Sequence, residues 1–416
     1  MSRHRCSTGG ERARVPITTA RPPKLDAFRG SVNFPPAKRT ALAVLGGILL
    51  LLAAACSTRP RPAPVDEGAF WPMYLGTPTR APFAQLRITE QPPTTLWSSG
   101  VGPAIRGVPV VTDEVIVAAS TDRKIQTVSR VDGSTLWRRG LPGPSVDPLV
   151  VGGVIYTATE DKGKLIALEV EEGDDIWERD APSIATPISV LNDTLYVAAE
   201  DGSLQAVASG RNEVWRVFFR RPASAGPLLL DSLIVYVAYD SVHVLDRRDA
   251  RLLAKTASPE IFSGEPASDG SNLYLVTERG SIYSWRLPQL DFNWQASGFG
   301  SFVSGPVIAG DDGYVVSRSG KLVHFDPVSG SASIIASLGD AVIAPPTVVA
   351  NGVIVGTLGG RLHFCRRNGD PVWDVELDGS IESPALVHEG RLIVPMYSKR
   401  RGTLSSGSQG KIVELR

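Results

Sequence analysis

A repeat of about 40 residues runs through most of this chain and restricts its fold more than any other feature of the sequence. One complete unit spans residues 148–177, PLVVGGVIYTATEDKGKLIALEVEEGDDIW. Its apolar runs are separated by short segments that contain glycine, which supplies the positive φ that tight β-turns require. The unit therefore predicts four short β-strands joined by hairpin turns.

Two independent series of residues give the number of units. The leading prolines are Pro109, Pro148, Pro187, Pro227, Pro266, Pro306, Pro346 and Pro384. The residues that close the units are Trp97, Trp137, Trp177, Trp215, Leu253, Trp294, Ile334 and Trp373. Successive members of both series are 38 to 41 residues apart. This period, with four strands in each unit, predicts an all-β fold, an eight-bladed β-propeller.

The two series are offset by one strand. The strand of Trp97 comes before the first leading proline, and the unit that begins at Pro384 has no closing strand of its own. We therefore expect the N-terminal strand to complete the last blade. This arrangement would close the ring and leave no open sheet edge.

The N-terminal region has the pattern of an export signal. Residues 41–55, ALAVLGGILLLLAAA, form an apolar run that follows Lys38 and Arg39 and precedes Cys56. The run is too short to cross a bilayer comfortably, and its basic flank is typical of a secretory signal. The end of the run, LLAAAC, resembles the lipobox of bacterial lipoproteins, although Ala53 replaces the usual leucine. The alternative is an uncleaved anchor with an incidental cysteine.

These features divide the chain into three expected parts. Residues 1–55 form a signal region with a long N-terminal extension, residues 56–70 a proline-rich tether, and residues 71–416 the propeller. Removal of residues 1–55 leaves 34 Lys and Arg against 41 Asp and Glu, a net charge of −7. Such an acidic protein is a poor candidate for nucleic-acid binding. In the shortened chain Cys56 would be acylated and Cys365 would be the only other cysteine, so no intramolecular disulfide is expected.

With the repeats and the lipobox placed, the chain resembles the PQQ-like repeat β-propeller lipoproteins of the BamB family. The resemblance covers roughly residues 71–416 and is carried by WPMYLGTPTR, PTTLWSSGVG and the repeat motifs GKLIAL, DGSTLW and NGDPVW. It implies a non-catalytic scaffold of outer-membrane β-barrel protein assembly, monomeric within a complex, with a BamA-like assembly factor as its partner. It also implies a periplasm-facing lipoprotein of the outer membrane, attached through Cys56.

In that family the tryptophan of each outer strand docks onto the next blade. The resemblance therefore implies a structural role for Trp97, Trp137, Trp177, Trp215, Trp294 and Trp373. Leu253 and Ile334 fill the same position of the repeat with less volume. We expect the two blades that end there to be the loosest.

Two other functions share this fold. Quinoprotein dehydrogenases use the same repeat, but many members have adjacent cysteines, and this chain has none. A ligand-binding or sensory lipoprotein is the second alternative. His243, His324 and His363 fall on expected third strands, yet no closely spaced second ligand accompanies them. The sequence therefore predicts no metal site, no cofactor and no catalytic residue.

Two segments stand out as candidates for partner binding, because aromatic and arginine side chains are enriched at interface hot spots. The link between the third and fourth units contains Phe218, Phe219, Arg220 and Arg221, and an insert in the last unit contains Lys399, Arg400 and Arg401. Solvated basic loops, with Phe218 or Phe219 packed in the sheet, are the alternative. We expect both segments to lie on one face of the propeller.

Overall fold

The computed structural model describes residues 83, 84, 86–399 and 408–416. The expected signal region, the tether and residues 71–82 lie outside these ranges, and so does Cys56. No helix in the described part of the chain is long and apolar enough to cross a membrane.

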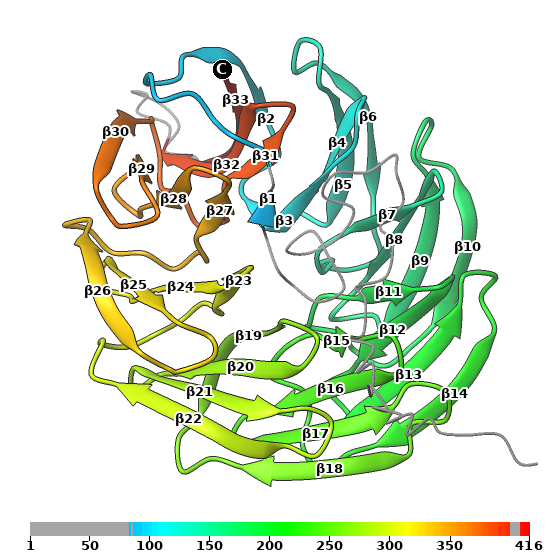
Figure 1. The fold of residues 1–416 in the computed structure, drawn as a ribbon. Helices are drawn as coiled ribbons and strands as arrows, with labels where there is room; N and C mark the ends of the chain where they lie inside the picture. Colours follow the sequence, from blue (N-terminus) through cyan, green and yellow to red (C-terminus); the bar gives the residue numbers. More distant parts are fainter. Residues whose placement is uncertain (1–82, 85, 400–407) are drawn as a thin grey trace, which may run out of the picture. The chain divides into compact units, whose positions relative to one another are not determined.

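Eight sheets are arranged around a ring (Figure 1), seven of them with four strands and one with five. In each sheet the strands that follow one another along the chain pair antiparallel, from the inner edge of the ring to the outer edge. This architecture confirms the expected all-β, eight-bladed β-propeller.

The bounds of the strands follow the repeat closely. Blade 1 contains β3 (Ile105–Val111), β4 (Val115–Ser120), β5 (Lys124–Ser129) and β6 (Thr135–Gly140). Blade 2 contains β7 (Leu149–Val151), β8 (Val154–Ala158), β9 (Lys164–Glu169) and β10 (Asp175–Asp180). Blade 3 contains β11 (Ser189–Leu191), β12 (Thr194–Ala198), β13 (Ser203–Ala208) and β14 (Glu213–Phe218). Blade 4 contains β15 (Leu228–Leu229), β16 (Leu233–Ala238), β17 (Ser241–Asp246) and β18 (Leu252–Ala257).

The second half continues in the same order. Blade 5 contains β19 (Phe262–Ser268), β20 (Asn272–Thr277), β21 (Ser281–Arg286) and β22 (Asp291–Ser297). Blade 6 contains β23 (Val307–Ala309), β24 (Asp312–Val316), β25 (Lys321–Phe325) and β26 (Ala332–Ser337). Blade 7 contains β1 (Phe83–Ala84), β27 (Thr347–Val349), β28 (Gly352–Gly356), β29 (Arg361–Cys365) and β30 (Pro371–Glu376). Blade 8 contains β31 (Leu386–His388), β32 (Arg391–Lys399), β33 (Ser408–Leu415) and β2 (Thr95–Gly100).

Because successive strands run in opposite directions, each blade has two distinct ends. The turns between first and second strands and between third and fourth strands lie on one face, which we call the turn face. The turns between second and third strands lie on the other face, together with the links to the next blade. We call this second face the connection face.

The core of the propeller lies between the blades. Eight clusters of buried residues are found in the described chain, one at each interface between neighbouring blades. The middle strands are covered on both sides, so β4 is buried at all six positions, whereas the outer strand β6 is mostly exposed. Strands buried on both faces need continuous apolar runs, which is the pattern of the repeat.

Six tryptophans on outer strands reach across these interfaces. The indole Nε1 of Trp137 donates a hydrogen bond to the carbonyl oxygen of Val170 in the next blade at 2.8 Å, and Trp177 does the same to Ser209. The same bond is made by the remaining four: Trp97 to Arg130, Trp215 to Arg247, Trp294 to Pro327, and Trp373 to Thr89. Each tryptophan therefore combines apolar packing with a satisfied polar atom.

The third turn of the receiving blade often carries a glycine beneath the indole ring. Gly133 and Gly330 have φ angles of 75° and 73°. A Cβ atom added to either residue would lie 2.5 Å from the ring of Trp97 or Trp294. These glycines are thus required twice, for the backbone conformation of the turn and for the close approach of the indole.

In blade 4 the residue at the docking position differs from the one expected from the sequence. Trp215 pairs with Ala206 in blade 3, and the corresponding residue of blade 4, Val244, pairs with Ala254 rather than Leu253. Leu253 is the extra residue of a β-bulge and its exposure is 37%. A bulge adds one residue to the strand, so counting along the repeat placed the wrong side chain in the interface.

Blade 6 shows a similar shift. Ile334 is 44% exposed, and Ile335 is the residue that lies against Gly369 of blade 7. The expectation that Leu253 and Ile334 occupy the docking position is therefore wrong for both residues.

Strand β2 and the last strand, β33, close the ring as expected. β2 pairs antiparallel with β33, from Thr95 opposite Leu415 to Gly100 opposite Lys411. Thr94 and Arg416 extend the ladder with two further backbone hydrogen bonds of 2.7 and 2.9 Å. The N-terminal strand thus completes blade 8.

The segment before β2 has a further role that the sequence did not predict. β1 pairs parallel with β27 at the inner edge of blade 7, and Ile88 is buried between blades 7 and 8. The Asn351 side chain bonds both the N–H and the carbonyl of Ile88. Because β2 comes before β3 in the chain, no turn joins β33 to β2 in blade 8, and the carbonyl of Thr89 accepts the bond from Trp373 instead.

We predict that Trp177→Ala lowers the free energy of unfolding by roughly 3–5 kcal/mol, because it removes a large interface side chain and leaves a cavity. Trp177→Phe should lower the free energy of unfolding by less, because it keeps most of the packing and loses only the hydrogen bond to Ser209 and part of the ring. Urea denaturation followed by circular dichroism measures both. Phe292→Ala is the control, because Phe292 is 60% exposed on an outer strand, and it should change stability by less than about 0.5 kcal/mol. Equal losses for Trp177→Ala and Phe292→Ala would contradict the docking role.

Candidate partner-binding site

The link from β14 to β15 places two adjacent aromatic side chains in different environments. Phe218, the last residue of β14, is 66% exposed. Phe219 packs inward and stacks on Tyr236 of blade 4, with ring centroids 4.0 Å apart and planes inclined by 18°. The centroid of its ring also lies 5.0 Å from that of the His243 ring, with the two planes inclined by 60°. Phe219 therefore helps to join blades 3 and 4, while Phe218 is available at the surface.

The two arginines that follow are exposed on the same link. The Tyr236 hydroxyl donates a hydrogen bond of 2.8 Å to the backbone carbonyl of Arg221, which fixes the path of the chain. The Arg221 side chain pairs with Asp240 at 3.1 Å, but the two side chains are 59% and 44% exposed. An ion pair this exposed contributes little to stability, so the guanidinium can change partners at low cost.

A hollow of about 500 Å³ opens beside this link on the connection face. Its lining carries three cations and one carboxylate, and the residues are Phe219, Arg220, Arg221, Ala238, Asp240, Ser241, His243, Lys255 and Ala257. Burial, and then the charge of Lys255, lower the pKa of His243 to about 4. His243 is therefore neutral at neutral pH, and the net positive charge of the hollow comes from Arg220, Arg221 and Lys255.

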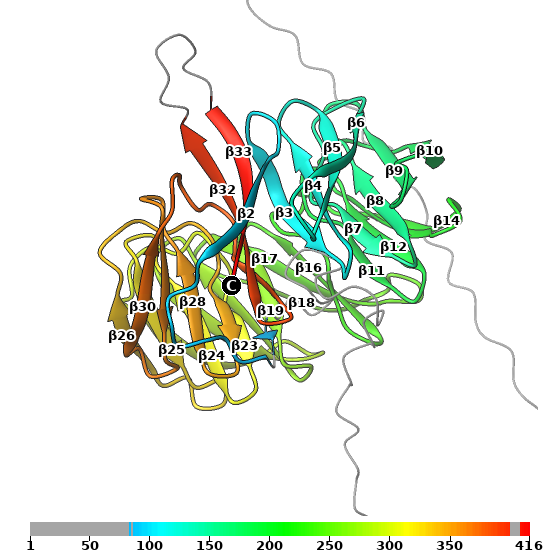
Figure 2. The same ribbon diagram turned by 90° about the horizontal axis from the view of Figure 1, so that it is seen from above.

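The second candidate segment is only partly described. β32 and β33 have nine and eight residues and form a hairpin that stands out beyond the neighbouring blades (Figure 2). Arg400, Arg401 and the side chain of Lys399 lie outside the described residues. The strand ends that flank them, like the link from β14 to β15, belong to the connection face.

The histidines considered as metal ligands are held by other contacts. His324 Nε2 lies 2.8 Å from an Asp312 carboxylate oxygen, and His363 Nδ1 lies 2.6 Å from Asp374. Within the described ranges no group of three His, Cys, Asp or Glu side chains could hold a metal ion. Burial raises the pKa of the Cys365 thiol to about 11, so this cysteine stays protonated at neutral pH.

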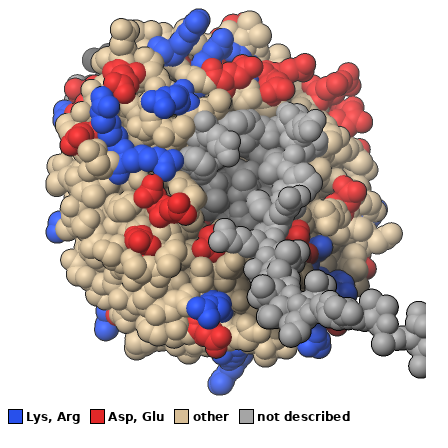
Figure 3. All heavy atoms as spheres, viewed as in Figure 1, with Lys and Arg blue, Asp and Glu red and all other residues tan. Residues whose placement is uncertain are grey.

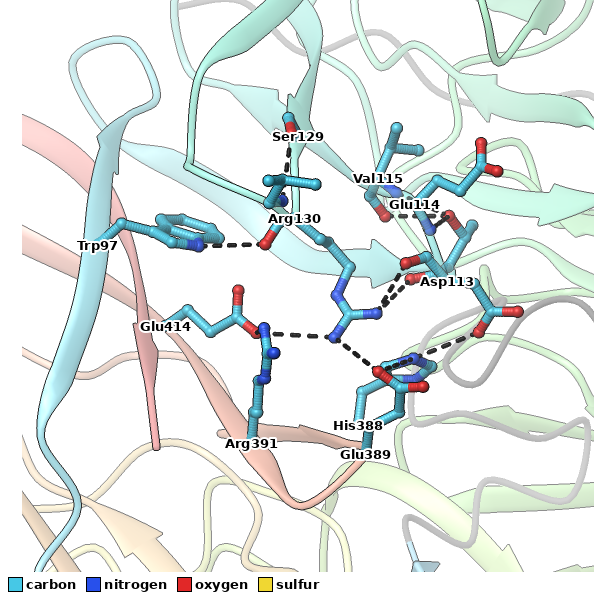
Figure 4. A network of polar contacts seen from close by, with 12 residues as sticks. Trp97, Asp113, Glu114, Val115, Ser129, Arg130, His388, Glu389, Arg391 and Glu414 are labelled. Carbon is cyan, nitrogen blue, oxygen red and sulfur yellow. Dashed lines mark hydrogen bonds and ion pairs between the residues drawn. The ribbon is translucent and has the colours of Figure 1, made fainter.

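A buried polar network at the junction of blades 8 and 1 was missed at the sequence level (Figure 4). The side chains of Arg130 and Glu414 are 5% and 0% exposed, and they approach to 3.6 Å. Arg391 pairs with the same carboxylate at 3.2 Å. The one signal in the sequence was a single carboxylate in the apolar strand KIVEL, residues 411–415.

His388 extends this network toward the turn face. Its Nε2 lies 3.3 Å from a carboxylate oxygen of Asp113, and its side chain is 4% exposed. Burial, together with the nearby charge of Arg130, lowers the pKa of His388, although Glu389 and Asp113 act in the opposite direction. The network joins the two blades at which the ring closes.

Comparison with solved structures supports the fold. BamB from Moraxella catarrhalis is 18% identical with a TM-score of 0.61, and the match covers 77% of this chain and 98% of that one. The quinohemoprotein alcohol dehydrogenase from Comamonas testosteroni is 11% identical with a TM-score of 0.65, covering 84% and 81%. A europium-containing methanol dehydrogenase is 10% identical with a TM-score of 0.70, covering 84% and 98%. At these identities the likeness shows the fold alone.

A search of curated proteins found no match. A family model described as outer membrane protein assembly factor BamB matches residues 87–208 and 200–331, together more than half of the chain. These two matches extend from the segment before β2 into blade 6. The chain therefore belongs to the BamB family of PQQ-like repeat β-propellers.

Proposed function

We propose that the protein is a non-catalytic scaffold of outer-membrane β-barrel protein assembly, anchored by lipid to the outer membrane and facing the periplasm. The observation that carries this proposal is the family match over residues 87–331. The likeness to BamB from Moraxella catarrhalis over 98% of its length supports it. The protein would act by holding a partner at its loops.

The anchor in this proposal is Cys56, acylated after removal of residues 1–55. Residues 56–70 would then form the tether to the propeller, whose first described strand, β1, lies at the inner edge of blade 7. Ser57 follows the cysteine instead of the aspartate that retains many enterobacterial lipoproteins in the inner membrane. This residue favours the outer membrane as the destination.

The partner in this proposal is a BamA-like outer-membrane assembly factor that contacts the connection face beside blades 3 and 4. Exposed Phe218 offers an apolar anchor, and Arg220 and Arg221 lie at the mouth of a cationic hollow. Aromatic and arginine side chains of this kind account for much of the binding energy at protein interfaces. An acidic segment of the partner would fit the charge of the hollow. Lys399, Arg400 and Arg401 would add a second basic contact on the same face.

A quinoprotein dehydrogenase is the second candidate, because the alcohol and methanol dehydrogenases share the fold over 84% of this chain. The three cysteines, Cys6, Cys56 and Cys365, are far apart in sequence, so the adjacent pair found in many such enzymes has no counterpart. A ligand-binding or sensory lipoprotein is the third candidate.

The anchor is tested with Cys56→Ser. One acyl chain binds membranes only marginally, whereas several chains hold a protein firmly, so loss of the acylated cysteine should release the protein into the soluble periplasmic fraction. Immunoblots of separated membrane and soluble fractions measure the distribution. Ser57→Ala is the matched control and should stay with the membranes. Membrane retention of the Cys56→Ser variant, as complete as that of the control, would contradict a lipid anchor.

The partner contact is tested with Arg220→Glu/Arg221→Glu. Reversal of both charges should weaken capture of the BamA-like partner from detergent-solubilised membranes, most strongly at low salt, because exposed charges act within about 10 Å at 0.1 M salt. The melting temperature should stay nearly unchanged, since both side chains are exposed.

Arg279→Glu/Arg318→Glu is the control for that experiment. It makes the same change in charge at two exposed arginines in turns of blades 5 and 6 on the same face. This variant should capture the partner as well as the unmodified protein does. Equal capture by both double variants at low and at physiological salt would place the contact elsewhere.

The enzyme and sensor candidates are tested by thermal-shift measurements with pyrroloquinoline quinone plus Ca²⁺, and with a panel of metals and oligosaccharides. A ligand at 100 times its dissociation constant stabilises a protein by about 2.7 kcal/mol, which is readily measured. We expect no shift and no dye reduction with alcohols or sugars. A shift with the quinone would favour the dehydrogenase, and a shift with any other ligand would favour the sensor.

A further inference from the structure

A groove between blades 1 and 2 on the turn face differs in charge and in lining residues from the cationic hollow on the connection face. Its volume is about 880 Å³, and it is formed by the first turns of both blades, the third turn of blade 2 and two outer strands. We call it the blade 1–2 groove, and its lining residues are Thr112, Asp113, Glu114, Val115, Leu136, Val150, Gly152, Gly153, Val154, Glu169, Val170, Glu171 and Ile176.

The walls of the groove are aliphatic. Leu136 and Ile176 are 54% and 44% exposed, and each is the extra residue of the β-bulge beside a docked tryptophan. The bulge leaves their side chains outside the strand ladder, where they face the groove together with Val150 and Val154. Aliphatic side chains that converge on one hollow differ from apolar residues scattered singly over a surface.

The rim of the groove is acidic. Asp113, Glu114, Glu169 and Glu171 are exposed, and the described lining residues include no Lys or Arg. In Figure 3 acidic side chains gather at the upper right, where Figure 1 places blades 1 and 2. This edge of the turn face therefore carries a concentrated negative field.

Arg130 and Arg139 lie near the groove and are committed to other partners. Arg130 faces Glu414 and donates two hydrogen bonds to backbone carbonyl oxygens. Arg139 donates to the carbonyl of Gly173 at 2.8 Å and pairs with Asp175. Neither guanidinium pairs with the carboxylates of Glu114, Glu169 or Glu171, so these three rim residues can attract a ligand, whereas Asp113 lies beside His388.

Hydrogen bonds to backbone carbonyl oxygens also fix the turns that form the groove. Arg130 Nη1 lies 2.9 Å from the carbonyl oxygen of Asp113, which fixes the first turn of blade 1 (Figure 4). The N–H of Val170 donates to the carbonyl of Gly153 at 3.0 Å and joins the two turns of blade 2. A preformed groove avoids the cost of ordering its loops when a ligand binds.

From this geometry we propose that the blade 1–2 groove binds an extended segment of a partner protein in which basic residues alternate with aliphatic ones. In an extended chain alternate side chains point to opposite sides. The aliphatic residues can then contact Leu136 and Ile176, while the long stems of Lys or Arg reach back to the acidic rim. An acidic or phosphorylated segment would be repelled by the same four carboxylates. This site is separate from the contact proposed at blades 3 and 4, and it does not depend on that contact.

The test measures fluorescence anisotropy with a labelled peptide of alternating lysine and leucine, added to the full chain in a zwitterionic detergent. A peptide with glutamate in place of lysine is the ligand control, and detergent alone provides the blank. Glu114→Gln/Glu171→Gln should raise the dissociation constant about tenfold, and Leu136→Ser should raise it by a similar factor. Added salt should weaken binding of the lysine peptide to the unmodified protein.

Glu278→Gln/Asp311→Asn is the matched control variant, because it removes two exposed carboxylates that lie outside the groove. It should bind the lysine peptide as the unmodified protein does, and circular dichroism should show all variants folded. The proposal is overturned if the groove variants and the control variant bind equally well. It is also overturned if the unmodified protein fails to bind the lysine peptide, or binds the glutamate peptide as tightly.

Discussion

Packing of each blade against both of its neighbours is the interaction on which the rest of this structure depends. A four-stranded sheet of this kind has two apolar faces, and neither can be covered from within the blade. The eight clusters of buried residues lie between blades, so the stability of each blade comes from its neighbours. The docked tryptophans strengthen these interfaces at the outer edge, and hydroxyl groups link the inner strands, as from Thr347 to the carbonyl of Ala385 at 2.6 Å.

Closure of the ring follows from this dependence. An open series of blades would leave one apolar face uncovered at each end, and the chain avoids this by pairing β2 with β33. The segment before β2 supplies what blade 8 lacks, including the carbonyl of Thr89 for Trp373. The pairing of Arg130 with Glu414 adds a buried electrostatic link between blades 1 and 8. Loss of Glu414 would remove the buried carboxylate that faces both Arg130 and Arg391, and leaving a buried guanidinium without that partner is far more costly than the pair itself is stabilising.

With its core committed to the blade interfaces, the propeller can vary only at its turns and links without loss of stability. The turns and links on the two faces differ in charge. The link between blades 3 and 4 borders a cationic hollow on the connection face, whereas the blade 1–2 groove on the turn face is acidic. Under the proposed function, two such surfaces would hold partners of opposite charge at separate places, because charge complementarity governs specificity and rate of association.

The sequence alone determined the period, the number of blades and the closing strand, because hydrophobic runs and turn glycines recur at a nearly constant spacing and each reports only local structure. It also singled out six tryptophans, and the Nε1 atom of each donates a hydrogen bond to a neighbouring segment. The tertiary structure decided everything that depends on a one-residue shift or on contact between distant blades. Because of the β-bulge, Ala254 and not Leu253 occupies the docking position of blade 4. After β14, Phe219 packs inward and Phe218 stays exposed. Arg130 and Glu414 come together only when the ring is closed, and Asp113 and Glu171 only when blades 1 and 2 are packed, so no local pattern could reveal that these side chains are neighbours.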